Sequence, residues 1–229
     1  MAETATSTFK ITWDDIGKRY YETGCDRGVL YPQTNGTYPK GAGWNGLISV
    51  AKKPSGAEFT PLYANNAKYV NLQSAEDFAC TIEAYTYPTE FEECNGKKTV
   101  VAGLTAGQQA RKPFGLTYRN FIGNDSDGTK GAYKISLIYG AQASPAEETD
   151  STINDDPEAK TMSWDCETPP VNMTGFEPTA IVELDSRSVD AENLAAFEKI
   201  IYGSGDAEAR LPLPDEVATL LGYQAPAAG

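Results

Sequence analysis

Apolar and polar residues alternate with a period of two along several stretches of the chain, which is typical of β-strands that bury one face. The segment 74–87 alternates in this way until the Tyr87-Pro88 pair stops the strand. The segments 133–139 and 162–167 repeat the pattern. In these three predicted strands, the alternation assigns the following side chains to the core: Phe78, Ile82, Ile135, Leu137, Met162 and Trp164.

Further apolar stretches at 28–33, 47–52 and 179–185 predict additional strands, separated by turns that contain Gly and Pro. About seven strands, with helical periodicity only near the end of the chain, favour a single mainly-β domain of the sandwich or barrel type. The expected organisation is an N-terminal arm over 1–10, a β-sandwich domain over 11–203 and a C-terminal segment over 204–229.

Helical periodicity appears near 190–202, where apolar residues recur every three or four positions. Asp190 can cap the start of this helix and Gly203 can end it. A second, shorter helix is predicted to begin at Pro214, a residue that suits the first turn. The remaining tail, 223–229, is rich in Ala and Pro.

A long polar connection is expected between the strands at 47–52 and 74–87. Pro54, Gly56 and Pro61 interrupt it, so the pattern predicts a loop without regular structure. Loops of that length within a compact domain are usually functional or flexible.

Composition narrows the possible chemistry. The formal net charge is −13, from 19 basic and 32 acidic residues. Such a surface repels nucleic acid and anionic lipid. The chain contains no His, which excludes Ser-His and Cys-His nucleophile pairs within one chain.

No metal site or cofactor is expected from the sequence. Its four cysteines lack the close pairs that zinc sites favour, and reduced, partly buried thiols are the expected state. The start of the chain lacks a basic-then-apolar signal, and no apolar run reaches the ~20 residues needed to span a bilayer. We therefore expect synthesis in a cytoplasm and no association with a membrane.

Acidic residues in 76–93 raise the possibility of a hydrolase that uses paired carboxylates. The alternation turns Glu83 to the face opposite the core, and Pro88 separates it from the later cluster, so no partner can be specified. A solvated acidic face is the favoured reading. The segment 124–131 begins like a calcium loop, but Lys130 and Ser136 occupy the positions where the motif requires Gly and Glu.

Several blocks of the chain resemble the major tail tube proteins of long, non-contractile-tailed bacteriophages. They include "TGCDRGVLYPQ", "RKPFGLTYRNFIGND", "YKISLIYGAQASPAEE", "MSWDCETPPV" and the long stretch from "YPKGAGWNG" to "YTYPTEF". The likeness runs from about residue 11 to about residue 220, and it depends on the order and spacing of the blocks. No single block is a catalytic motif.

The resemblance implies a β-sandwich with a flanking α-helix that assembles into a hexameric ring with a continuous inner β-barrel. Stacked rings would form the virion tail tube, assembled in the host bacterial cytoplasm together with tape measure and tail terminator proteins. DNA would pass through the lumen without specific binding. Glu83 and Tyr85 are the candidates for facing that lumen.

The same resemblance assigns the long connection near 52–69 to contacts with the neighbouring ring. The candidate residues for ring stacking are Lys53, Pro54, Ser55, Gly56, Glu58, Phe59 and Tyr63. The alternative is a β-sandwich binding or decoration module on a virion or cell surface, suggested by the Tyr-rich strands. A structural subunit without catalytic activity is the favoured hypothesis.

Overall fold

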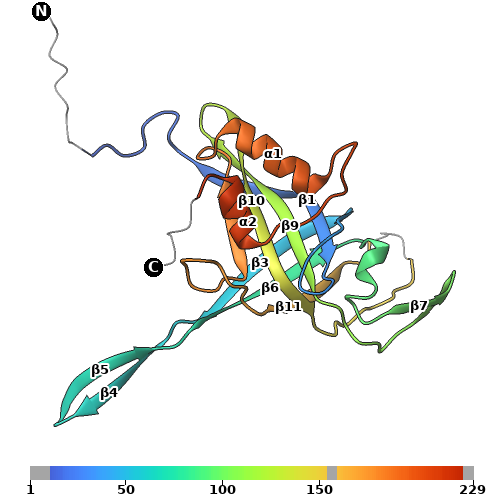
Figure 1. Cartoon of the computed structure of the whole chain (residues 1–229), viewed down its shortest axis with the longest axis horizontal. Helices are drawn as coiled ribbons and strands as arrows, with labels where there is room; N and C mark the ends of the chain where they lie inside the picture. Colours follow the sequence, from blue (N-terminus) through green and yellow to red (C-terminus); the bar gives the residue numbers. More distant parts are fainter. Residues whose placement is uncertain (1–10, 154–158, 224–229) are drawn as a thin grey trace, which may run out of the picture.

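A computed structural model describes residues 11–153 and 159–223 (Figure 1). The proposed N-terminal arm over 1–10 and the last residues of the Ala/Pro-rich tail, 224–229, lie outside the described residues. The described chain is mainly β with two helices, which confirms the prediction of a mainly-β fold.

Two antiparallel sheets share one long strand, β10 (Gly128–Ala143). We call the first the helix-side sheet; its strands run in the order β2 (Ala42–Gly43), β1 (Tyr21–Pro32), β9 (Phe114–Asn124), β10 and β12 (Ile181–Asp185). We call the second the wall sheet; it consists of the end of β10, then β11 (Met162–Thr168), β6 (Glu76–Ala84) and β3 (Leu47–Gly56).

An aromatic core fills the space between the two sheets. Trp164 on β11 is fully buried there, and its ring contacts Phe91 at a centroid distance of 5.0 Å and Trp44 at 6.0 Å. Phe91 belongs to a short 3₁₀ turn, η1 (Thr89–Phe91), that follows β6. The inward side chains of the strands, including Leu116 and Ile82, complete this core. Burial of so much aromatic area is the main stabilising contribution to the sandwich.

A second core lies on the opposite face of the helix-side sheet. The helices α1 (Ala191–Tyr202) and α2 (Pro214–Leu220) cover this face (Figure 1). Phe197 and Ile201 of α1 are fully buried against it, in the same apolar cluster as Ile135 and Leu137 of β10. As the capping pattern predicts, the Asp190 carboxylate accepts from the first backbone N–H groups of α1, and the helix ends at Gly203.

Four of the six predicted core residues, Ile82, Ile135, Leu137 and Trp164, have no exposed area. Phe78 and Met162 are only half-buried and pack at the edge of the inter-sheet core. The reason is their position: Phe78 lies near the start of β6, where the wall sheet leaves the body, and Met162 is the first residue of β11.

Two hairpins project from the body at different ends (Figure 1). One consists of β4 (Phe59–Ala64) and β5 (Ala67–Gln73), and the other of β7 (Lys98–Val101) and β8 (Leu104–Ala106). The expectation of a long irregular loop over 52–69 is therefore wrong. Pro54 lies in β3, which is an edge strand of the wall sheet, and Pro61 lies in an isolated hairpin, in which both strands are edge strands. Edge strands tolerate proline, so neither residue prevents pairing.

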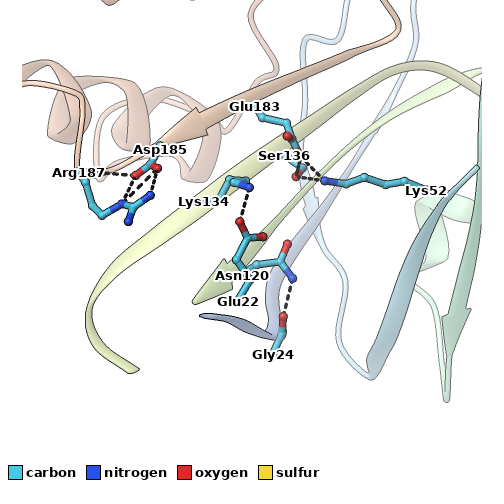
Figure 2. A network of polar contacts seen from close by, with 9 residues as sticks. All are labelled: Glu22, Gly24, Lys52, Asn120, Lys134, Ser136, Glu183, Asp185 and Arg187. Carbon is cyan, nitrogen blue, oxygen red and sulfur yellow. Dashed lines mark hydrogen bonds and ion pairs between the residues drawn. The ribbon is translucent and has the colours of Figure 1, made fainter. Parts of the chain in front are cut away.

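Polar side chains tie the two sheets together at one end of the sandwich (Figure 2). Lys52 of β3 donates to the Ser136 hydroxyl at 3.2 Å and pairs with the Glu183 carboxylate on β12. Partial burial acts to raise the pKa of Glu183, but the hydrogen bond and charge of Lys52 outweigh it, so this pKa lies below its ordinary value. Nearby, Lys134 pairs with Glu22. Each charge in this cluster has a partner, so its role is structural.

Candidate assembly surfaces

The outer face of the wall sheet is small, polar and acidic. Cross-strand register places Ser49, Glu83 and Ser163 side by side, and the neighbouring row contains Thr81 and Asp165. Every second residue of these strands points to the same face. The charged residues on this face are Lys53, Asp77, Glu83, Asp165 and Glu167. Four carboxylates and one ammonium give this face a formal charge of −3.

Hydrogen bonds connect several of these side chains across neighbouring strands. Asp165 accepts from the Lys53 ammonium at 2.8 Å and from the Thr81 hydroxyl at 2.5 Å, and these two bonds lower the pKa of Asp165. Glu83 accepts from the Ser49 hydroxyl at 2.8 Å. The bonded carboxylates of Asp165 and Glu83 therefore have fixed positions on a face without large apolar side chains.

The wall sheet has open edges. β3 pairs with β6 from Leu47 to Gly56, and no other strand of the described chain pairs with its far side. On the other side of the sheet, β11 pairs with β10 only at Glu167 and Cys166. Unpaired backbone donors and acceptors along such an edge can accept a strand from another chain.

The β4–β5 hairpin, which we call the arm, exposes large apolar side chains on both of its faces. The exposed fraction is 63% for Phe59, 70% for Tyr63 and 78% for Tyr69. Leu62, Val70 and Leu72 are exposed as well. A two-stranded hairpin is marginal in water by itself, and contiguous apolar surface of this kind typically marks an interaction site.

The geometry of the arm is specified locally. Asn65 and Asn66 form its two-residue turn, both with positive φ (49° and 62°), as a type I′ turn requires. At its base, Gly56 has a φ of 82°, and a Cβ placed there would lie 2.3 Å from the Ala75 carbonyl oxygen. Only glycine fits this joint between the arm and the wall sheet.

Replacement of Gly56 by alanine is expected to loosen the arm while the body stays folded. The clash must shift the backbone at the joint, in addition to the strain of a positive φ. We expect amides in 59–73 to exchange hydrogen at least about tenfold faster, which corresponds to about 1.4 kcal/mol. Gly103→Ala is the matched control, because its φ is 85° and nothing lies within 4 Å of the added Cβ. Equal arm exchange in both variants would contradict the assigned role of the joint.

The candidate stacking residues fall into two groups. Glu58, Phe59 and Tyr63 lie at the base of the arm or on it, whereas the other four, Lys53, Pro54, Ser55 and Gly56, pair with β6 within the wall sheet. Of the lumen candidates, Glu83 lies on the acidic outer face, and Tyr85 lies just past the end of β6 with 55% of its area exposed.

Sequence reasoning missed both strands of the arm, although the second carries a signal. Tyr69, Val70 and Leu72 belong to an alternating stretch that follows an Asn-Asn pair, and that combination is a hairpin signal. The exposed apolar tip of β7–β8 was also missed, because its strands are too short to show a period.

The later acidic residues are structural or solvent-exposed. Glu92 accepts from the Thr99 hydroxyl at 3.1 Å, and Glu93 pairs with Lys112 at 3.4 Å. Within the described ranges, no three potential metal ligands come together. All four cysteines are free thiols, and burial raises the pKa of Cys25 to about 11. Neither described helix is long and apolar enough for a bilayer crossing.

No known protein family and no curated protein matches this chain. The surfaces described above therefore carry the functional argument.

Proposed function

We propose that the chain is a structural subunit that polymerises through its own copies into a tube, as the major tail tube subunit of a long-tailed bacteriophage. The arm carries this proposal. It projects large apolar side chains, including Phe59, Tyr63 and Tyr69, which the described chain leaves exposed. Such a hairpin is suited to lie against another subunit.

The wall sheet supports the same function. Strand addition at the open edge of β3 would join wall sheets of adjacent subunits, in hexameric rings as the family resemblance implies. The acidic face around Glu83 would then line the lumen. DNA repelled by that lining would slide through and not adsorb. The proposed place of action is the virion tail, together with tape measure and tail terminator proteins.

Electron microscopy of the purified protein tests the proposal directly. At high concentration, the chain is expected to form rings or tubes with a central channel. A protein that remains monomeric over a wide range of concentrations, and also in the presence of partner tail proteins, would overturn it.

Charge reversal on the wall sheet tests the lumen assignment. The double variant Glu83→Lys with Glu167→Lys changes the formal charge of the outer face from −3 to +1. We expect its assemblies to retain DNA at low salt and to release it as salt rises, because phosphate contacts are salt-dependent. Fluorescence anisotropy of labelled DNA measures the effect.

The control carries the same change in total charge on another surface. Asp206→Lys with Glu208→Lys alters two exposed residues in the turn after α1. Equal DNA retention by the two double variants would show that total charge matters and the wall face does not.

A further inference from the structure

The β7–β8 hairpin and its base combine basic and apolar side chains. Residues 97–112 contain no acidic residue, although the whole chain has a net charge of −13. Their basic residues are Lys97, Lys98, Arg111 and Lys112. Lys97 pairs with Glu148 and Lys112 pairs with Glu93, both at 3.4 Å, and these contacts fix the base of the hairpin. Lys98 begins β7 and is exposed.

The tip of this hairpin is apolar and exposed. Val100 has 60% of its area exposed, Val101 59% and Leu104 56%. These three side chains surround a tight turn at Gly103, whose φ is 85°. More than half of the area of each of these side chains contacts solvent.

A groove at the base of the arm is lined by apolar and acidic residues, which complement the apolar tip and the basic residues of the hairpin. Its volume is about 1060 Å³, and it lies between the start of β6 and the segment 168–182. Met173, Phe176 and Ile181 contribute to its apolar lining. Its charged lining residues are Glu76, Asp77 and Glu177, and no basic side chain lines it.

We infer that this groove receives the β7–β8 hairpin of a second copy of the chain. The apolar tip of the hairpin would bury Val101 and its neighbours against Phe176, and Lys98 would approach the carboxylates of the rim. This inference rests on the proposed self-assembly, and it identifies a contact distinct from the arm itself. Both the apolar match and the charge match favour this occupant.

The positions of the two surfaces require separate copies. The β7–β8 hairpin and the arm project from the body in opposite directions along the long axis, and the groove lies at the base of the arm (Figure 1), so one subunit cannot make the contact with itself. A contact between two different surfaces is heterologous. Repeated heterologous contacts generate closed rings or filaments, and not isolated dimers.

Site-specific photo-crosslinking tests this contact. A benzophenone amino acid at Val101 is introduced into the full chain, and the crosslinked peptides are identified after assembly with isotope-labelled wild-type subunits. We expect crosslinks to residues 168–182 or 73–78 of a labelled copy. Crosslinks that map only to the arm tip, to wall-face residues outside 73–78 or to the same copy would overturn the inference.

A pair of substitutions provides an independent measure. Val101→Asp places a charge in the apolar groove and is expected to raise the concentration for half-maximal assembly at least about tenfold. Val101→Ile, the matched control, is expected to stay within about twofold. Melting of the isolated subunit should be unchanged in both, because Val101 is exposed.

The outcomes separate the two proposals. Normal assembly of Val101→Asp, with crosslinks outside the groove, would refute this contact and leave tube formation intact. A wild-type chain that never assembles would refute both.

Discussion

Removal of the arm is expected to abolish tube formation while the subunit stays folded. The backbone N–H of Ser74 donates to the Glu58 carbonyl at 3.1 Å, so a two-residue turn can close the hairpin at that pair. The variant replaces 59–73 with Asn-Gly, which suits a type I′ turn. It retains the wall sheet and nearly all of the groove lining. Because the removed side chains are exposed, the melting temperature should change little.

Electron microscopy and sedimentation measure this result. We expect monomers or single rings in place of tubes, with a loss of sedimentable material of at least about tenfold. Asn66→Gly is the control, because it preserves the turn at the end of an intact arm. Tubes of normal length from the shortened chain would refute the stacking role of the arm.

Replacement of Trp164 by alanine is expected to cause the largest loss of stability. The side chain is fully buried among Trp44, Tyr87 and Phe91, with ring contacts of 5.0–6.0 Å. Removal of such a ring costs about 3–5 kcal/mol. For a chain of this size, the melting temperature should fall by roughly 6–20 °C.

Thermal unfolding followed by circular dichroism checks this expectation. Ser163→Ala, one residue away on the exposed outer face, is the matched control and should change stability by less than about 0.5 kcal/mol. An unchanged melting temperature for Trp164→Ala would remove this residue from the core.

The alternating pattern was sufficient to predict the strands that bury one face. Trp164 and Ile82 lie in the inter-sheet core because alternate residues of a strand point to the same face, and their neighbours at this spacing are apolar. The helix α1 was equally predictable, from its capping Asp190 and its apolar spacing. In each case the signal is local, within one strand or one helix.

The second core was not predicted. The run Leu137-Ile138-Tyr139 is apolar without alternation, because the strand is buried on both sides: Ile138 packs between the sheets, and its two neighbours pack under the helices. Periodicity cannot specify which partner covers which face. Tertiary packing decides that, through residues far away in sequence such as Phe197.

The candidate surfaces were predictable only in part. The outward direction of Glu83 follows from the alternation, but its neighbours on the face, Ser49 and Ser163, come from strands distant in sequence. The arm was interpreted as a loop because Pro54 and Gly56 precede it and Pro61 lies within its first strand. Its pairing depends on cross-strand contacts between Phe59–Ala64 and Ala67–Gln73, which composition does not reveal.

The continuous strand pairing from the wall sheet into the arm restricts how the reach of the arm can change. β3 and β6 pair as far as Gly56 and Glu76, and β4 and β5 resume the pairing up to the Asn65-Asn66 turn. An insertion in only one strand would invert its side chains relative to the opposite strand. The arm already contains one irregularity of this kind, the register shift between Leu62 and Tyr63. Insertions that keep the regular pairing elsewhere are matched on both strands. Two residues per strand would extend the arm by about 6.8 Å, so variation in its length would be stepwise, not gradual.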